Sequence, residues 1–455
     1  MSSTPVPRQP CHAVAVVGGA TAGAEVAGRL AERGVLVAVF EQNPRPYGKI
    51  EDGLPRWHVA LRRKEYETIN AKLARPGVYF VPRTSVGRDV SLAALTGEWG
   101  FSAVVLANGA WRDRPLPVEG ADRYVGKGLI YQNPFIIWFN HAAEAGYQGP
   151  VFEPMDDVLV VGGGLASIDV AKVLMLETTR ARLGERGILV GMVDLEVKGI
   201  PKTLAAHGLE FGDLGLEGCT LFYRRRLEDM PLVEIPEGAD EKRISKMRAA
   251  RAKLLEKAME KYRFKFEPLS APDGLLVEGD RLVGLRFRRT RIEEGRVIPT
   301  DETYERRGSY VVSSIGSIPA PLAGVEMKGE LYAFSDWDVG RLEGFPTLFS
   351  AGNVVTGKGN IVASRKHAEH VSEHVIERFL GLGDGHEGEE VLADGADAQA
   401  AATAEAVAGS LAAQPPLPPD ALEALLARIA ARQEAVGYDG DYREWLARVT
   451  PPDLE

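Results

Sequence analysis

Short apolar runs separated by turns and amphipathic stretches recur along the chain. Val14–Val17 is apolar and β-branched, a helical pattern then extends through Ala31, and Val35–Phe40 is again apolar. Buried strands of parallel sheets have this continuous apolar character, and strands that alternate with helices form βαβ units. The first 40 residues therefore predict a strand, a turn, a helix and a second strand of a parallel sheet.

The first turn has the spacing of a dinucleotide-binding loop. Gly18 and Gly23 frame it, and Glu41 follows 23 residues after Gly18, at the end of the second predicted strand. Such a loop brings backbone N–H groups and a helix N-terminus to a pyrophosphate, while the acid accepts hydrogen bonds from ribose hydroxyls. Ala20 replaces the middle glycine of the usual motif, which narrows the approach of the phosphates. An ordinary βαβ unit with a glycine-rich turn is the alternative.

The same arrangement recurs in the middle of the chain with a different ending. Val158–Val161 leads into three glycines and a helix, and the next predicted strand, Cys219–Tyr223, is followed by Arg224 and Arg225. Arginines bind a 2′-phosphate that a carboxylate would repel, so this unit is predicted to bind NADP(H) in preference to NAD(H). A solvated basic turn is the alternative. The residues expected at this turn are Gly162, Gly164, Leu165, Ala166 and Ser167.

Further apolar runs predict strands at Val78–Val81, Ala103–Ala107, Leu282–Arg289, Val311–Ile315 and Leu348–Ala351. The residues between Leu195 and Gly218 are an expected insertion between helix and strand of the second unit. Glu241–Phe266 predicts a long helix and an exit strand, with ten Lys/Arg between Lys242 and Lys265. A solvated helix face is the simpler interpretation of these bases, and a docking surface for an acidic protein is the other.

Composition limits the class of protein. At 455 residues and 45% hydrophobic content, the chain is expected to be globular with two or three domains. It contains no apolar run of about 18 residues, so no membrane span is expected, and the first ten residues lack an apolar signal core, which favours the cytoplasm. The net charge of −10 is concentrated in residues 381–455, with 15 acids and four Lys/Arg. Nucleic-acid binding is not expected.

Cysteine usage narrows the redox chemistry. Only Cys11 and Cys219 are present, without a C-x-x-C motif. This excludes the usual redox-active dithiol and a cysteine-ligated iron–sulfur cluster or zinc site within the chain. No metal site is predicted.

Taken together, the two glycine turns, Asn108-Gly109-Ala110, the arginines, Ser314–Pro319 and Ala351-Gly352-Asn353 resemble the adrenodoxin reductase-like ferredoxin–NADP⁺ reductases of the glutathione reductase superfamily. The chain is also similar to the glutamate synthase small subunit around Tyr223–Pro231. The resemblance covers about residues 12–380. It implies an α/β fold with two Rossmann-like dinucleotide-binding domains, for FAD and NADP(H), the second inserted in the first.

The corresponding segments are 1–112 and 315–380 for the FAD domain, 113–314 for the NADP domain, and 381–455 for an acidic, Ala/Pro-rich linker and helical tail. Ten alanines between Ala396 and Ala413 indicate a linker or a weakly held helix. Asp420 can cap a following amphipathic helix that packs on the body or on a second subunit. Because the resemblance ends near residue 380, the tail is expected to be dispensable for FAD binding. The residues that share one face of this helix are Leu422, Leu425, Leu426 and Ile429.

The resemblance also implies the site residues. His58 is the candidate catalytic side chain, because the family has a histidine near the flavin and the nicotinamide; a loop histidine satisfied by backbone is the alternative. Asn353 stands where the superfamily usually has Asp. Besides the residues of the second turn, Arg224 and Arg225, the implied cofactor contacts are Gly18, Ala20, Ala22, Gly23, Glu41, Gln42, Gly48, Lys49, Trp57, Ala107, Asn108, Gly109, Gly316, Gly352, Asn353, Gly359, Asn360 and Ile361.

By this resemblance, the chain is an FAD-dependent NADPH oxidoreductase that exchanges electrons with a ferredoxin or another iron–sulfur partner. Two alternatives stay open. The chain could be the flavin subunit of a larger, glutamate synthase-like complex, whose clusters would lie on another chain. It could also be a non-catalytic FAD-binding module, although such a module needs no NADP(H) site. A homo-oligomer is compatible with either enzyme hypothesis.

Overall fold

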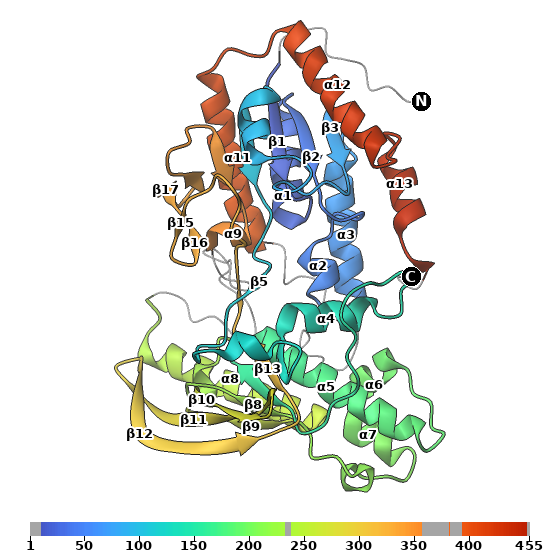
Figure 1. The fold of residues 1–455 in the computed structure, drawn as a ribbon, viewed down its shortest axis with the longest axis vertical. Coiled ribbons are helices and arrows are strands. Elements are labelled where there is room, and N and C mark those ends of the chain that lie inside the picture. Colours follow the sequence, from blue (N-terminus) through green and yellow to red (C-terminus); the bar gives the residue numbers. More distant parts are fainter. Residues whose placement is uncertain (1–10, 233–237, 357–381, 383–393, 453–455) are drawn as a thin grey trace.

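The computed structural model describes residues 11–232, 238–356, 382 and 394–452. They form two lobes, one above the other in Figure 1, and each lobe is built on a sheet that is mainly or entirely parallel. The sheet of the first lobe has the order β17-β18-β19-β4-β1-β2-β3, in which β18 runs antiparallel to both β17 and β19. Its strands are β1 (Ala13–Val17), β2 (Leu36–Phe40), β3 (Val78–Val81), β4 (Ala103–Leu106), β17 (Phe334–Asp336), β18 (Arg341–Leu342) and β19 (Leu348–Ser350).

The second sheet is parallel throughout, with the order β6-β13-β7-β8-β9. All its strands lie between β4 and β17 in the chain, so the second lobe is inserted in the first. This confirms the predicted fold class, while the domain boundaries given above stay a prediction. The strands are β6 (Leu129–Tyr131), β7 (Leu159–Gly162), β8 (Thr220–Phe222), β9 (Lys265–Glu267) and β13 (Val311–Ser314).

Helices cover both sheets, as expected when a parallel sheet is buried on both faces. The first lobe contains α1 (Thr21–Glu32), α2 (Lys49–Asp52), α3 (Val59–Leu73), the π-helical turn η1 (Ala94–Glu98) and α9 (Asn353–Thr356). The second contains η2 (Ala121–Tyr124), α4 (Gln132–His141), α5 (Leu165–Gly184), α6 (Met192–Lys198), α7 (Ile200–Ala205), η3 (Phe211–Leu214), η4 (Leu227–Asp229) and α8 (Glu241–Tyr262). The predicted insertion thus consists of short helices, and the predicted long basic helix is α8.

An antiparallel sheet adjoins the second lobe. It consists of β10 (Ser270–Glu278), β11 (Arg281–Glu293) and β12 (Arg296–Arg307), with β11 in the centre. The sequence predicted part of β11 and missed β10 and β12. Both missed strands contain a proline, and β12 is mostly polar. Two further strand pairs are β5 (Arg112–Asp113) with β14 (Ser317–Ile318), and β15 (Met327–Lys328) with β16 (Leu331–Tyr332). The first pair joins the two segments that connect the lobes.

The C-terminal segment is part of the first lobe. α11 (Asp394–Ala412) packs beside α1, and α12 (Pro419–Ala435) and α13 (Tyr442–Val449) follow along the same lobe in Figure 1. Ala400, Ala404 and Val407 are completely buried. The interpretation of residues 396–413 as a linker or weakly held helix is therefore wrong. Alanines lower the apparent amphipathicity of such a helix, yet they allow close contact with α1. Leu422, Leu425 and Ile429 of α12 are buried as predicted, and α12 begins after Pro418 instead of Asp420.

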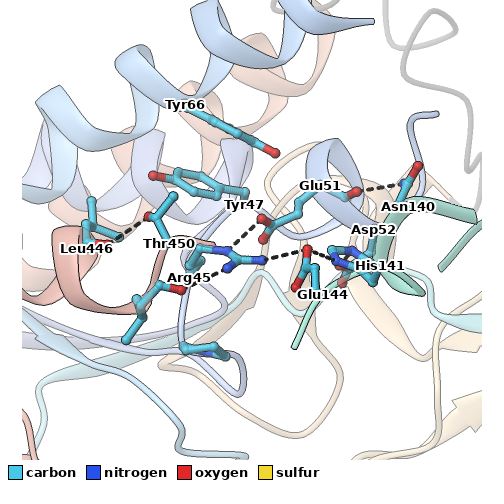
Figure 2. A network of polar contacts seen from close by, with 12 residues as sticks. Arg45, Tyr47, Glu51, Asp52, Tyr66, Asn140, His141, Glu144, Leu446 and Thr450 are labelled. Atoms are coloured by element: carbon cyan, nitrogen blue, oxygen red, sulfur yellow. Dashed lines mark hydrogen bonds and ion pairs between the residues drawn. The ribbon is translucent and has the colours of Figure 1, made fainter. Parts of the chain in front are cut away.

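A polar network joins the two lobes. Arg45 Nε donates to Glu51 Oε1 at 2.7 Å, and Arg45 Nη1 donates to the Val449 carbonyl of α13 at 2.9 Å. From α4 of the second lobe, His141 contacts Asp52 Oδ1 at 3.0 Å and Glu144 Oε1 at 2.6 Å. Arg45 Nη2 lies 3.6 Å from Glu144 Oε1, and Figure 2 shows that this ion pair connects the two groups of contacts. The network links α2, α4 and the C-terminal segment, and therefore fixes the junction between the lobes.

Candidate functional site

A cavity of about 300 Å³ lies at the carboxyl ends of the strands of the first lobe. This is the edge where open α/β sheets bind ligands. Residues from several distant segments meet there, and many of the sequence-predicted cofactor contacts are among them. Those that line the cavity are Gly18, Ala20, Ala22, Glu41, Gln42, Gly48, Lys49, Ala107, Asn108, Gly109, Gly352 and Asn353.

The glycines of the first turn are required by close backbone packing. A Cβ atom at Gly18 would lie 2.5 Å from the Ala107 carbonyl oxygen, and Gly18 has φ +98°. A Cβ atom at Gly23 would lie 1.8 Å from the Gly18 carbonyl oxygen. Glycine at both positions allows β1, β4 and α1 to approach one another, which points the N-terminus of α1 at the cavity.

The methyl group of Ala20 has room because the residue opposite it is a glycine. A Cβ atom at Gly48 would lie 2.9 Å from Ala20 Cβ, and one at Gly352 would lie 2.7 Å from Ala22 Cβ. Gly48 thus leaves room for the methyl group of Ala20, and Gly352 leaves room in the same way for that of Ala22. Both of these glycines also have positive φ angles, +49° and +79°.

Glu41 is buried at the end of β2 and is held by backbone donors. The Gly19 N–H donates to Glu41 Oε2 at 2.8 Å, and the Asn43 N–H donates to Glu41 Oε1 at 2.9 Å. Burial raises the pKa of this carboxyl to about 7, and the backbone hydrogen bonds oppose that shift. The carboxylate therefore ties the glycine turn to the strand end and presents an acceptor at the position expected for ribose hydroxyls.

Two further polar side chains face the cavity. Asn108 Nδ2 donates to the Tyr332 hydroxyl at 3.2 Å, whereas Asn108 Oδ1 is enclosed without a hydrogen-bond partner among the described residues. A buried amide oxygen of this kind is costly unless a ligand satisfies it. Lys49 Nζ donates to Ser317 Oγ at 3.0 Å, and burial lowers the pKa of Lys49 to about 8. The cavity thus offers a buried acceptor and a nearby cation, which fits a flavin dinucleotide.

The second glycine turn lies between β7 and α5. A Cβ atom at Gly162 would lie 2.6 Å from the Ser314 carbonyl oxygen, whereas one at Gly164 would meet no atom within 4 Å. Ser167 Oγ donates to the Gly164 carbonyl at 2.6 Å and stabilises the start of α5. Gly164 therefore borders open space at a helix N-terminus, and this cradle fits the pyrophosphate of a second dinucleotide. Leu165 and Ser167 are buried, and Ala166 is half-buried.

Gly163 was not singled out from the sequence, yet it fixes the next strand. A Cβ atom there would lie 2.0 Å from Tyr223 Cε2, so the Tyr223 ring packs directly on the turn. Arg224 follows this ring and is exposed. Arg225 Nη1 donates to the Gly295 carbonyl at 3.0 Å. The structure therefore places the arginines beside the second glycine turn.

The candidate catalytic residue His58 does not line the cavity of the first lobe. Its neighbour Trp57 packs into the core of the second lobe, with its ring 5.1 Å from that of Phe139 and 4.7 Å from Lys172 Nζ. Burial, together with the positive charge of Lys172, lowers the pKa of His58 to about 3, so its imidazole is neutral. The structure places Trp57 and His58 where the first lobe contacts the second, and a catalytic role for His58 stays a prediction.

Gly316 lies at the second crossover, where its carbonyl accepts a hydrogen bond from the Arg114 N–H at 2.9 Å. It is exposed and does not line the cavity. Gly359, Asn360 and Ile361 lie outside the described residues, so their expected contacts stay a prediction.

Two residues of α11 that were not predicted lie behind the cavity wall. Gln399 Oε1 accepts a hydrogen bond from the Gly352 N–H at 2.6 Å, and Thr403 Oγ1 lies 3.2 Å from the Ser350 carbonyl oxygen. They hold the turn after β19 that presents Gly352 and Asn353. The signal available in the sequence was a pair of polar residues, four positions apart, within an alanine-rich helix.

The comparisons with known proteins agree with this geometry. The sequence model of the pyridine nucleotide-disulphide oxidoreductase family matches residues 12–211. The mitochondrial NADPH:adrenodoxin oxidoreductase of Arabidopsis thaliana is 23% identical over 400 residues, covering 78% of this chain and 79% of that protein. The NADPH glutamate synthase small chain of Mycobacterium tuberculosis (strain H37Rv) is 32% identical over 162 residues, which are 34% of this chain and 32% of that protein.

Among solved structures, FprA of Mycobacterium tuberculosis in complex with NADPH covers 93% of this chain and 91% of its own, with a TM-score of 0.62 and 17% identity. At 17% identity this structural similarity is evidence for a shared fold.

The fold, the two sites and these matches define a pyridine nucleotide-dependent flavoprotein. The chain is an FAD-dependent NADPH oxidoreductase, similar to the adrenodoxin reductase-like enzymes and to the glutamate synthase small subunit. The predicted resemblance, enzyme class and cofactors FAD and NADP(H) are confirmed.

In the parts of the chain that the structure describes, no helix is long and apolar enough to span a membrane. Within the same residues, no three His, Cys, Asp or Glu side chains are grouped to hold a metal ion.

Proposed function

We propose that the enzyme transfers electrons from NADPH to a ferredoxin or another iron–sulfur protein. The observation that carries this proposal is the similarity to the NADPH:adrenodoxin oxidoreductase of Arabidopsis thaliana, which extends over 78% of this chain and thus includes both lobes. The two cysteines support it, since they cannot form the usual dithiol relay. Cys219 is buried and burial raises the pKa of its thiol, so it is a poor nucleophile. Electrons must then leave to a separate acceptor.

The residues of each site have distinct tasks in this function. In the first lobe, Gly18, Gly23 and Glu41 would bind the pyrophosphate and ribose of FAD, and Asn108 Oδ1 would gain a hydrogen-bond donor. In the second lobe, Gly164 and the start of α5 would bind the pyrophosphate of NADP(H). When bound, FAD accepts a hydride as an electron pair and can release electrons singly. The protein supplies binding, orientation and exclusion of water.

The direct test is NADPH-driven reduction of a ferredoxin. We expect reduction of ferricyanide by NADPH without a partner, and reduction of cytochrome c that depends on added ferredoxin. A panel of [2Fe–2S] and [4Fe–4S] ferredoxins would identify the cluster type that is accepted. Ferricyanide turnover with no acceleration by any iron–sulfur protein would contradict the proposed partner while leaving the enzyme class intact.

The exposed start of α8 is the surface that we expect an acidic partner to contact. Lys242, Arg243 and Lys246 are exposed there. Opposite charges steer such encounters and make the association rate depend on salt. The double variant Lys242→Glu/Lys246→Glu should lower kcat/KM for ferredoxin by roughly tenfold at low salt and leave ferricyanide reduction unchanged. Lys328→Glu, an exposed charge reversal on the first lobe, is the control. Equal effects of the two variants would exclude α8 as the docking surface.

A second candidate function is that of a flavin subunit in a larger complex. It is favoured by the 32% identity to the glutamate synthase small chain, although that match spans about a third of each chain. Affinity purification of the tagged protein from its native extract distinguishes the candidates. A stoichiometric large subunit that carries iron–sulfur clusters would support the complex, and co-purification of a small ferredoxin alone would support the separate reductase.

A further inference from the structure

The backbone that carries the arginines of the NADP(H) site is held by the neighbouring antiparallel sheet. Three consecutive carbonyls accept hydrogen bonds from it. The Tyr223 carbonyl accepts from the Ser270 N–H at 2.9 Å, the Arg225 carbonyl from the Leu269 N–H at 3.0 Å, and the Arg224 carbonyl from the Thr290 hydroxyl at 2.8 Å. The first two donors are backbone groups at the start of β10. The third is a side chain, so it is the one that a substitution can remove.

Thr290 is well placed to act as this donor. It lies on β11 with only 5% of its surface exposed. Its N–H donates to the Leu269 carbonyl at 2.9 Å, which fixes its backbone next to the arginine loop. A buried hydroxyl with a short hydrogen bond to one carbonyl restrains that peptide group and the direction in which the Arg224 side chain leaves the chain.

The three arginines differ in what already engages them. Arg226 makes a two-pronged ion pair with Asp229, at 2.8 and 3.1 Å. Arg225 donates to the Gly295 carbonyl in the turn between β11 and β12. Arg224 is exposed and follows the Tyr223 ring that packs on Gly163. Within the part of the chain that the structure describes, Arg224 is therefore the arginine of the three that would give up the fewest contacts on binding a nucleotide.

With Arg224 taken as the 2′-phosphate ligand that the sequence predicts, we propose that Thr290 is a positioning residue that sets nucleotide specificity through the Arg224 carbonyl. This inference rests on the proposed NADP(H) site of the second lobe. The antiparallel sheet β10–β12 then has a task of its own, because it fixes the loop that discriminates NADPH from NADH. Arg225 has a supporting role through its contact with the turn at Gly295.

The test compares NADPH and NADH in matched variants, with ferricyanide as the acceptor. Thr290→Val removes the hydroxyl at nearly constant volume, and its preference for NADPH over NADH should fall about 3- to 10-fold, the loss expected for one neutral hydrogen bond. The change should lie in KM for NADPH, with kcat and the NADH constants unchanged. Thr290→Ser should retain the wild-type preference. Arg224→Ala should lower the preference roughly 10- to 100-fold, more than Arg225→Ala.

Thr300→Val is the matched control. Thr300 Oγ1 donates to the Arg289 carbonyl at 2.9 Å, so this variant loses the same kind of bond at the peptide group that precedes Thr290, while the bond from Thr290 to the Arg224 carbonyl is kept. Calorimetric binding of adenosine 2′,5′-bisphosphate gives a readout without turnover, and its Kd should rise in Thr290→Val and not in Thr300→Val. Thr290→Ala replaces the valine variant if that protein does not fold.

Two outcomes overturn the inference, and they differ in what else they overturn. If Arg224→Ala loses NADPH preference while Thr290→Val behaves like Thr300→Val, Thr290 does not position the arginine, and the NADP(H) site stands. If Arg224→Ala lowers kcat/KM for both nucleotides by the same factor, Arg224 does not bind the 2′-phosphate. In that case the assignment of the second site to NADP(H) through these arginines is also wrong.

Discussion

Single residues shape the first site mainly through the space that they leave free. Gly23 is the clearest example, because a Cβ atom there would lie 1.8 Å from the Gly18 carbonyl oxygen. Gly23→Ala must displace the turn or α1, so FAD affinity should fall at least about tenfold as overpacking disturbs the pyrophosphate site. Fluorescence titration of the apoprotein with FAD measures this. Gly184→Ala, at the end of α5 with no atom within 4 Å, should leave the affinity unchanged. Equal behaviour of the two variants would contradict the packing argument.

A second prediction at this scale concerns the charge of Glu41. Burial raises its pKa to about 7, and a ribose hydroxyl needs the ionised form as acceptor. FAD affinity of the apoprotein should therefore weaken as the pH falls from 8 to 6, because the carboxyl becomes protonated in this window. Glu41→Gln keeps the shape and removes the titration. Its FAD affinity should be lower at pH 8 and nearly flat across the window. A wild-type affinity that does not change with pH would contradict this role.

At the scale of single residues, the framing glycines of both turns and Glu41 of the first turn could be singled out, because their spacing in the sequence is itself the constraint. Gly163 escaped prediction since its role depends on the Tyr223 ring, 60 residues away. Likewise, Thr290 and Gln399 act through backbone carbonyl and N–H groups of distant segments. No local pattern reports such contacts before the fold is known.

Among the elements, helix α4 contributes a titratable link between the lobes. Burial lowers the pKa of His141, but hydrogen bonds to Asp52 and Glu144 outweigh it and raise the pKa to about 9. The folded pKa is thus above the unfolded value of 6.5. The link contributes fully below pH 6.5 and is lost as the pH rises through 9. The full shift corresponds to about 3 kcal/mol, which solvent screening reduces to on the order of 1–2 kcal/mol. Denaturant unfolding at pH 6.5 and pH 9.5 should show this loss, and His141→Asn should be less stable at pH 6.5 and less sensitive to pH.

The control for this experiment is His207→Asn. His207 is an exposed histidine that follows α7 in the second lobe. Its replacement should leave the difference in unfolding free energy between the two pH values as in the wild type. If His141→Asn retains the full pH dependence, the network in Figure 2 does not carry it.

Elements whose residues are strongly apolar could be predicted, whereas elements rich in polar residues or in alanine could not. The strands Val78–Val81 and Leu348–Ser350 agree with the sequence prediction to within one residue, because buried parallel strands are continuously apolar. β12 was missed since its exposed residues alternate with half-buried ones such as Tyr304. α11 was misjudged because alanine is a weak hydrophobic signal, although its small side chain is what lets the helix pack closely against α1.

For the whole molecule, the order of the motifs predicted that one dinucleotide-binding lobe is inserted in the other. It did not predict that residues 394–452 complete the first lobe. Trp445 of α13 is 1% exposed and its Nε1 donates to the Pro44 carbonyl at 2.8 Å. Through Arg45 and Val449 the same segment reaches the junction between the lobes. Chain segments that are furthest apart in sequence thus meet beside the FAD site.

This arrangement reverses the expectation that the tail is dispensable. A protein truncated before residue 394 would expose the faces of α1 and the first sheet that α11, α12 and α13 cover, and it would lose the Gln399 contact to Gly352. We expect the truncated chain to be insoluble or to purify without FAD.

The smaller change Gln399→Ala removes one hydrogen bond to Gly352, and should raise the Kd for FAD about 3- to 10-fold with little loss of stability. Gln414→Ala, just after the opposite end of α11, is the control, because among the described residues Gln414 Nε2 bonds to Ser410 of the same helix. A soluble truncated protein with full flavin content would show that α11 covers the first lobe without supporting its site.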